Sequence, residues 1–268
     1  MNHTYTTNGL LLKAENINLQ YDNKQILKDI NFEIHDIVRP ELVQGQIVSI
    51  IGKSGMGKTQ LLKILAGLII PDSGSVKINA DQHSLMEGEM GIIFQNYLLF
   101  NHRTVYQNLA IGLKHSVKKL TDSEKKEIIK DFAKQFDLFE HLQKYPSQLS
   151  GGQRQRVSII QQVLTGNRFL LFDEPFSGLD VVMTDKVINL LLKIANAHEL
   201  NTLIIVSHDI VNALAISDTA FILASQEGKQ GATITEKIDL MKMGLAWEPD
   251  VKCNPLFSKL VGEIKYKI

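Results

Sequence analysis

The stretch Gly52-Lys53-Ser54-Gly55-Met56-Gly57-Lys58-Thr59 decides the fold, because three glycines and a Lys-Thr pair follow the apolar run 47–51 directly. Glycine permits backbone conformations that turn successive N–H groups toward one anion, and a helix beginning near Lys58 adds its positive end. Lys58 supplies a mobile positive charge, and the Thr59 hydroxyl is a suitable ligand for Mg²⁺. The stretch therefore predicts a phosphate-binding loop between a strand and a helix. An ordinary glycine turn is the alternative.

Strand and helix patterns alternate on both sides of this loop. Segments 10–19 and 26–34 show partial apolar alternation around a turn at 21–23, which predicts two paired strands. The segment 35–46 contains Pro40 and lacks periodicity, so we expect an extended loop there. We also expect helices over 58–66, 181–197, 209–216 and from Pro255, a turn over 71–74, and strands over 47–51, 76–78, 92–94, 169–173, 202–206 and 220–223.

A helical insertion is expected in the middle of the chain. From 104 to 145 apolar residues recur at intervals of three and four, and 121–124 resembles a capping box. The predicted fold class is α/β: a P-loop NTPase of RecA-like type, with a mainly parallel sheet core, an N-terminal antiparallel β subdomain and an inserted helical subdomain. We expect the ATP-binding core with its β subdomain over 1–94 and 166–230, the helical subdomain over 95–165, and a short tail over 231–268.

Composition excludes several classes of function. The 268 residues include 29 Lys and Arg and 29 Asp and Glu, so no net charge draws the molecule to nucleic acid or anionic lipid. The single cysteine, Cys253, cannot form an internal disulfide, which fits a reducing cytosol. The start lacks the features of a signal peptide, and no window approaches the apolar length of a membrane helix. We expect that the chain does not span a bilayer alone.

Polar residues follow the ends of three expected parallel strands, where ligands of such sheets bind. Asp173 ends the continuous apolar run 169–173, which is typical of a strand buried on both faces, and a carboxylate there needs a cation such as Mg²⁺. Glu174 is placed to orient or deprotonate an attacking water. A solvated acidic turn is the alternative. Because the glycine loop and His208 also follow strand ends, the three sites can converge.

The pentapeptide Leu149-Ser150-Gly151-Gly152-Gln153 lies between the loop and the acidic strand. Its serine and glycines would open a helix running to Val163, which offers a second helix start able to bind an anion. A polar helix cap without a ligand is the alternative.

Together these motifs resemble the ATP-binding subunit of an ABC (ATP-binding cassette) transporter, and the resemblance covers nearly the whole chain. Segment 52–59 is similar to the family's Walker A loop, Gln95 to its Q-loop, 149–153 to its signature, 170–174 to Walker B, 177–180 to the D-loop and His208 to the switch histidine. The order of the motifs is also the family's.

The resemblance implies ATP and Mg²⁺ as cofactors and assigns roles to single residues. Catalytic roles fall to Glu174, His208 and Gln95, and metal binding falls to Thr59, Gln95 and Asp173. Nucleotide binding falls to Tyr21, Gly52, Ser54, Gly55, Gly57, Lys58, Thr59 and Gln60, and, across a head-to-tail dimer, to Ser150, Gly151, Gly152, Gln153 and Asp180. A surface glutamine, a helix-start histidine, a structural turn at 180 and a packing tyrosine remain the alternatives for Gln95, His208, Asp180 and Tyr21.

The resemblance also implies partners and a place in the cell. It implies an ATP-hydrolysing subunit that works as a homodimer or with a paired ATPase, with transmembrane permease subunits and a substrate-binding protein, at the cytoplasmic face of the membrane. We expect import of a small anion or sulfonate. A lipid-trafficking system is the alternative, and an ATPase acting on nucleic acid or ribosomes is less favoured, so no nucleic acid is expected as a partner. Segment 98–100 with 104–105 resembles the surface that receives a helix of a membrane subunit, although ordinary packing is also open.

Overall fold

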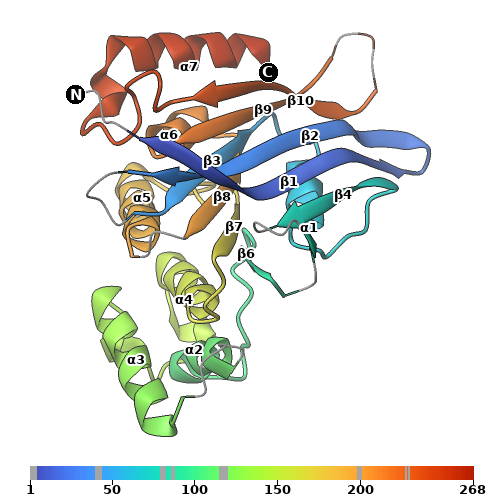
Figure 1. The fold of residues 1–268 in the computed structure, drawn as a ribbon. Coiled ribbons are helices and arrows are strands. Elements are labelled where there is room, and N and C mark those ends of the chain that lie inside the picture. Colours follow the sequence, from blue (N-terminus) through green and yellow to red (C-terminus); the bar gives the residue numbers. More distant parts are fainter. Residues whose placement is uncertain are drawn as a thin grey trace.

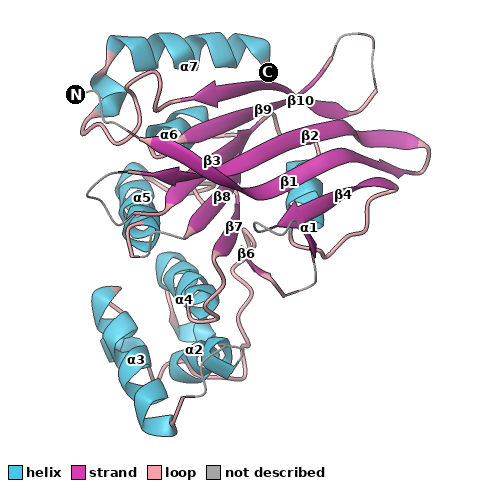
Figure 2. Ribbon diagram, in the orientation of Figure 1, coloured by secondary structure: helices cyan, strands magenta, loops and turns pink. Residues whose placement is uncertain are grey.

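One mixed sheet organises the part of the chain that the computed structural model describes, namely residues 5–39, 44–78, 83–85, 88–114, 120–197, 201–226, 228 and 230–268. Its ten strands are ordered β5-β4-β1-β2-β10-β9-β3-β8-β7-β6 (Figure 2). They are β1 (Thr6–Tyr21), β2 (Lys24–Val38), β3 (Gln46–Ile51), β4 (Ser73–Ile78), β5 (His83–Ser84), β6 (Met90–Ile93), β7 (Phe169–Asp173), β8 (Thr202–Ser207), β9 (Thr219–Ser225) and β10 (Ala232–Asp239).

The sheet has a parallel core. The neighbouring strands β9, β3, β8, β7 and β6 run parallel to one another. The helices are α1 (Lys58–Leu65), α2 (Val105–Lys114), α3 (Asp122–Gln135), α4 (Gly151–Val163), α5 (Val181–Ala195), α6 (Ile210–Ala215) and α7 (Pro255–Lys267), with short 3₁₀ turns η1 (Phe139–His141), η2 (Pro146–Gln148) and η3 (Val251–Cys253). The predicted α/β class with a mainly parallel core and an antiparallel N-terminal part is confirmed.

Both faces of the core strands are buried, as the apolar run at 169–173 predicts. On β7, Leu170 and Phe172 join one apolar cluster, whereas Phe169 and Leu171 join a second one on the opposite face. The first cluster includes side chains of α4, α5, α6 and α7, and the second is closed by α1 together with β1, β2 and β4. The sheet is therefore the middle layer, and its strand ends are the accessible parts.

The N-terminal strands are longer than the sequence predicts. Residues 35–38 continue β2 instead of forming a loop, because the start of β1 pairs with them, for example Thr6 with Val38 and Leu10 with His35. Gln46 already belongs to β3, and 40–43 lie outside the described residues. The expectation of an extended loop over 35–46 is thus wrong for most of its described part.

The structure also differs from the prediction at the turn 71–74, at the end of β6 and in the tail, besides shifts of one or two residues at the ends of other elements. Ser73 and Gly74 begin β4 instead of only forming a turn; Gly74 has a φ of 91°, and a Cβ there would lie 2.4 Å from the carbonyl oxygen of Asn16 in β1. β6 ends at Ile93, before Phe94. Strand β10 has no counterpart in the prediction, and it joins the tail to the sheet by antiparallel pairing with β9. The predicted final helix from Pro255 is present as α7.

The helical insertion follows β6. Helices α2, α3 and α4 group at one end of the molecule beyond β6 and β7, whereas α7 lies along β10 at the opposite end (Figure 1). The predicted capping box is confirmed: the backbone N–H of Thr121 donates to Glu124 (2.7 Å), and the N–H of Glu124 donates to the Thr121 hydroxyl (3.3 Å). Searched over the residues described, the helices include none with the length and apolar character needed to cross a membrane.

Candidate functional site

The carboxyl ends of β3, β7 and β8 meet at one edge of the sheet because the three strands are neighbours and parallel. The glycine loop, Glu174 and His208 follow these ends and line one cavity of about 470 Å³. The cavity wall consists of Tyr21, Ile26, Ser54, Gly55, Gly57, Lys58, Thr59, Gln60, Gln95, Glu174, Ser177 and His208. Ten of the sequence-predicted site residues therefore lie around one space.

The glycine loop owes its shape to residues without a side chain. Gly55 and Gly57 both have a φ of 84°, in the left-handed region where glycine is favoured, and Gly57 is the N-cap of α1. A Cβ at Gly57 would lie 2.8 Å from Ile26, and a Cβ at Gly52 would lie 2.4 Å from the carbonyl oxygen of Leu223. Gly52 is not part of the cavity wall but lets the loop pass close to β9.

Lys58 begins α1 and its side chain turns back over the loop. Its Nζ donates to the carbonyl oxygens of Gly52 (2.8 Å) and Lys53 (3.0 Å) and lies 3.2 Å from Glu174 Oε1. The side chain is only 6% exposed. A buried ammonium group at the start of a helix, within a ring of backbone N–H groups, attracts a polyanion such as the phosphate chain of a nucleotide.

Glu174 is held from several sides. Its Oε2 accepts hydrogen bonds from the Ser207 hydroxyl (3.1 Å), from the backbone N–H of His208 (3.1 Å) and from His208 Nδ1 (2.8 Å). Since a carboxylate only accepts, Nδ1 is the protonated nitrogen of this contact. The backbone of Glu174 has a φ of 50°, a left-handed conformation that is uncommon for a residue with a side chain. These contacts aim the carboxylate into the cavity.

Of the three residues predicted to bind a metal, Thr59 and Asp173 are in direct contact with each other. The Thr59 hydroxyl donates to Asp173 Oδ1 at 3.0 Å, and burial raises the pKa of Asp173. Gln95 lines the cavity, where its amide donates to the Ser177 hydroxyl (3.1 Å). Mg²⁺ in nucleotide sites takes one or two carboxylates plus phosphate oxygens, and a buried carboxylate beside a hydroxyl fits that pattern. A cluster of three or more His, Cys, Asp or Glu side chains that could hold a metal is absent from the described ranges.

Tyr21 lies at the rim of the cavity. Its hydroxyl donates to Gln60 Oε1 at 3.3 Å, and 44% of the residue is exposed. An exposed ring beside the glycine loop is available for stacking on an aromatic base.

The second group of predicted nucleotide ligands is separate from this cavity. Ser150 caps α4, accepting from the Gln153 N–H (3.3 Å), and its own N–H donates to Gln153 Oε1 (2.9 Å). Asp180 caps α5 by accepting from the N–H of Met183 (2.8 Å). A Cβ at Gly152 would nearly touch the Met183 side chain, so the two helix starts lie side by side. The group, Ser150, Gly151, Gly152, Gln153 and Asp180, takes no part in the cavity wall.

The sequence prediction missed four residues with contacts at these sites. Ser207 and Ser177 hold Glu174 and Gln95, and Ile26 contributes apolar wall. Ser177 begins the segment 177–180, and Ser207 lies between the expected strand 202–206 and His208, so their positions in the sequence were an available signal. His141, whose Nε2 lies 2.8 Å from Gln153 Nε2, has no such signal, because η1 reaches the start of α4 only in the folded insertion.

The fold and the glycine loop define a P-loop NTPase. The ABC transporter family model matches residues 35–177. The chain belongs to the ABC transporter family, and within it the chain is similar to the ATP-binding components. This relationship agrees with the order of motifs along the sequence.

Similar proteins carry the names of import subunits. The chain is 37% identical over 229 residues to the spermidine/putrescine import ATP-binding protein PotA of Thermotoga maritima, covering 83% of this chain and 58% of that protein. It is 34% identical over 224 residues to the sulfate/thiosulfate import ATP-binding protein CysA of Synechocystis sp. (82% and 60%) and 35% identical over 212 residues to a probable CysA of Chlorella vulgaris (78% and 85%). The chain thus spans little more than half the length of the two bacterial proteins.

Solved structures share the fold. A dimeric ATP-binding cassette in a post-hydrolysis state with ADP and phosphate superposes with a TM-score of 0.69, at 24% identity, covering 86% of this chain and 99% of that one. cbiO1 of Clostridium perfringens, part of the ABC transporter complex cbiONQ, gives a TM-score of 0.72 at 24% identity, covering 96% and 100%.

Proposed function

We propose that the chain is the ATP-hydrolysing subunit of a multi-subunit ABC transporter, which couples binding and hydrolysis of MgATP to movement of cargo through separate membrane subunits. The observation that carries the proposal is the placement of Glu174 inside the glycine-loop cavity, 3.2 Å from Lys58 and 2.8 Å from His208. A fixed carboxylate beside a phosphate cradle has the means to activate water, which binding alone does not require.

The cradle binds the nucleotide. The backbone N–H groups of the loop, including those of Ser54 and Gly55, and the ammonium group of Lys58 hold the β- and γ-phosphates. Gln60 flanks the phosphates from the first turn of α1, and Tyr21 stacks on the adenine, a contact worth roughly 1–3 kcal/mol by analogy with base-stacking aromatics. Mg²⁺ would be held by Thr59, Asp173 and Gln95, and when bound it neutralises charge on the phosphates.

Glu174 acts on the water. Its carboxylate accepts a proton from the water that attacks the γ-phosphate, or fixes the orientation of that water. Ser207 and His208 hold Glu174 in the required direction, and His208 is also close enough to donate to a γ-phosphate oxygen. Gln95 senses the site from the start of the helical insertion, since its loop connects β6 to α2.

The second half of each site comes from another subunit in this proposal. Ser150, Gly151, Gly152 and Gln153 of one copy, or of a paired ATPase, cap the γ-phosphate held by Lys58 of the other, and Asp180 lies across the interface. Supporting it, Ser150 and Gly151 are exposed at the positive end of α4 and lie outside the subunit's own cavity. A helix start with free N–H groups is a good anion site.

We further propose import as the direction, with permease subunits and a substrate-binding protein as partners and the cytoplasmic face of the membrane as the location. The relatives named above are import proteins for sulfate/thiosulfate or spermidine/putrescine, which favours import over lipid trafficking or action on nucleic acid. Sulfate agrees with the expected small-anion cargo, and polyamines are the competing class. The exposed Leu98 and Phe100 form the surface offered to a permease helix.

Purification from membranes tests the transport role. A tagged chain expressed in its own cell should co-purify with apolar permease subunits, and Leu98→Glu should release it without changing ATP hydrolysis in solution. A chain that stays free of membrane proteins in both forms argues against the transporter role. The exposed Ile70→Glu, on a segment outside 98–105, serves as the matched control.

A further inference from the structure

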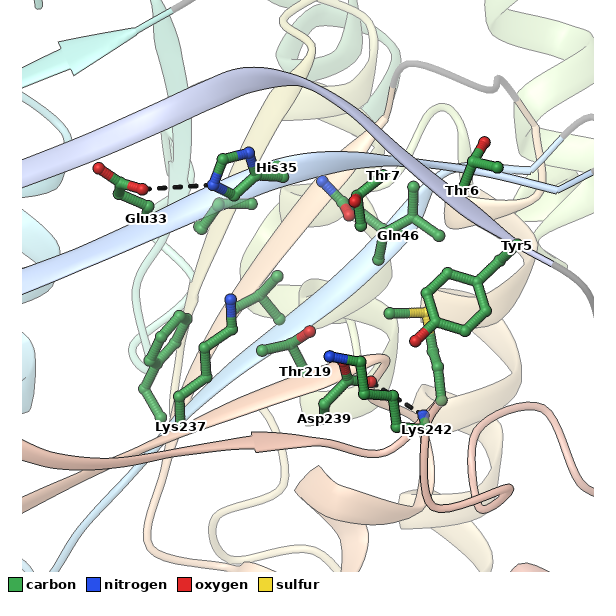
Figure 3. A pocket seen from close by; sticks show the side chains of 15 residues that line it. Tyr5, Thr6, Thr7, Glu33, His35, Gln46, Thr219, Lys237, Asp239 and Lys242 are labelled. Atoms are coloured by element: carbon green, nitrogen blue, oxygen red, sulfur yellow. Dashed lines mark hydrogen bonds and ion pairs between the residues drawn. The ribbon is translucent and has the colours of Figure 1, made fainter.

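A second cavity, larger than the first, lies at the other end of the core strands. It has a volume of about 750 Å³, within the range of small-molecule sites. We call it the rear cavity and define it by Gln46, Thr219 and Lys237 on one side and Thr7, Glu33 and His35 on the other. Figure 3 shows these side chains converging on the space between β1–β2 and the strands β3, β9 and β10.

The rear cavity is distinct from the glycine-loop cavity. Gln46 begins β3 at the rear cavity, whereas the glycine loop follows Ile51, the last residue of this strand, so the two cavities lie at opposite ends of β3. Among the residues that the structure describes, none lines both cavities. The proposed ATPase chemistry makes no use of the rear cavity.

Most charges in the rear cavity already have partners. Glu33 lies 3.3 Å from His35 and 3.4 Å from Lys13. Asp239 lies 3.5 Å from the ammonium group of Lys242 and also accepts from the backbone N–H of that residue (3.0 Å). These groups compensate one another.

Lys237, which is exposed, and Gln46, which is buried, each keep a polar group without a partner among the described residues. Lys237 extends from β10 into the cavity with its Nζ 5.8 Å from the Phe221 ring, and no carboxylate of the described part of the chain forms an ion pair with it (Figure 3). Gln46 is 3% exposed, and its Nε2 donates to Thr202 (3.3 Å), but its Oε1 is buried with no hydrogen-bond partner. Buried polar atoms are nearly always satisfied, so an unused acceptor in a cavity wall points to a donor that enters from outside.

The floor between these two groups is apolar. Ile34, Val48 and Phe221 line it and are almost fully buried, since they continue the core beneath α1. An occupant therefore meets a cation, a carbonyl acceptor and a hydrocarbon surface together. We propose that the rear cavity binds a small organic acid that carries a hydroxyl or ammonium group near its carboxylate, as a hydroxy acid or an amino acid does. The carboxylate pairs with Lys237, and the hydroxyl or ammonium group donates to Gln46 Oε1.

Calorimetric titration of the full chain with four probes tests the proposal. L-malate and L-serine carry both a carboxylate and a donor, succinate lacks the donor, and inorganic sulfate lacks both the donor and the carbon skeleton. Malate or serine should bind with a Kd of about 1 mM or tighter. Succinate and sulfate should bind at least about tenfold more weakly, since the buried acceptor then stays unpaired. If malate binds, a hydroxyl suffices as the donor; if serine binds and malate does not, an ammonium group is required.

Variants assign the binding to the two side chains. Lys237→Met should weaken binding at least about tenfold because a charge-assisted contact is lost, whereas Lys237→Arg should keep most of it. Gln46→Leu should remove the preference for malate or serine over succinate. Lys265→Met, an exposed lysine of α7 outside the cavity, is the matched control and should bind as the wild type does. Unchanged ATP binding by each variant shows that the chain is folded.

Three results would overturn the proposal: no heat from malate or serine at about 10 mM, equal binding of succinate or sulfate, or wild-type binding by Lys237→Met. If Gln46→Leu fails to fold, the comparison of malate with succinate on the wild type decides the role of the donor alone.

Discussion

The carboxylate of Glu174 has different partners on its two oxygens. Oε1 faces the ammonium group of Lys58, and Oε2 accepts from Ser207 and His208. A group held in this way needs little reorganisation when it acts, which is how preorganised sites lower barriers. We therefore expect its chemistry, more than its packing, to govern turnover.

Glu174→Gln should abolish hydrolysis while nucleotide binding persists. The amide has nearly the same shape but cannot accept a proton, so the rate should fall about 10²–10⁴-fold. Phosphate release measures the rate, and titration with a fluorescent ATP analogue measures binding. Glu140→Gln, an exposed glutamate of η1, is the control. Undiminished hydrolysis by Glu174→Gln would remove this residue from the mechanism.

Removal of Mg²⁺ with EDTA should stop hydrolysis reversibly. Asp173→Asn should raise the Mg²⁺ concentration needed for half-maximal rate by at least about tenfold, because a buried carboxylate ligand is lost. A magnesium titration of the hydrolysis rate is the measurement, and Asp131→Asn on the exposed face of α3 is the matched control. An unchanged titration curve for Asp173→Asn contradicts the metal role.

Single residues of the site were predictable where they follow a strand end. Lys58, Glu174 and His208 fall there, and the parallel sheet brings those ends together. Their hydrogen-bond partners were not predictable in the same way. The contact of Gln95 with Ser177 spans 82 positions and depends on two loop conformations that no local pattern encodes.

Among the secondary-structure elements, helix α4 has a hydrogen-bonded N-terminal cap, yet the space around Gly151 in its first turn is empty. The capping box of Ser150 and Gln153 satisfies two N–H groups, and a Cβ at Gly151 would meet nothing within 4 Å. The subunit alone does not need a glycine at 151. The proposed contact with a second subunit's γ-phosphate does need it, because a methyl group would stand between the helix start and the anion.

Gly151→Ala should therefore separate folding from assembly. We expect an unchanged or slightly higher melting temperature, since alanine is the better helix former, and ATP-dependent dimerisation weakened at least about tenfold. Light scattering after size exclusion, in a Glu174→Gln background that retains ATP, measures the dimer. Gly262→Ala on α7 also meets open space and is the matched control. Full dimerisation by Gly151→Ala would refute the composite site.

The strand β10 and the end of β2 show why local sequence patterns do not predict every strand. On β10 the alternation of Ala232 and Ile234 is interrupted by a register shift between Ile234 and Glu236, so the strand lacks a clean period of two. The end of β2, 35–38, has two polar residues followed by two apolar ones and so also lacks a period of two, yet it is a strand because the start of β1 pairs with it. Long-range pairing, which the local sequence does not reveal, decided both.

At the scale of the whole molecule, one buried ion pair joins the end of β2, the core and the tail. Arg39 lies 2.8 Å from Asp218 and stacks on the ring of Trp247, and Asp218 also accepts from the N–H of Ile47 (2.7 Å). Burial raises the pKa of Asp218 to about 6 and lowers the pKa of Arg39 to about 10. Both shifts disfavour the charged forms, so the pair itself adds little stability.

Removing one partner of the Arg39–Asp218 ion pair should lower the free energy of unfolding more than replacing both partners. Asp218→Asn leaves the guanidinium of Arg39 buried without its counter-charge and should lower the free energy of unfolding by about 3–5 kcal/mol. The double variant Arg39→Met, Asp218→Asn should lose clearly less. Urea unfolding at neutral pH measures both, with Lys265→Met as a surface control. Equal losses in the single and double variants would contradict a buried charge as the cause.

The left-handed backbone at Glu174 carries conformational strain that the contacts of its side chain must offset. An L-residue with a side chain gives up about 1–2 kcal/mol in that conformation, and glycine would not. Glu174→Gly would relieve this strain but would leave the ammonium group of Lys58 buried without its carboxylate, which costs more. The left-handed conformation therefore persists because the side-chain contacts of Glu174 outweigh its backbone strain.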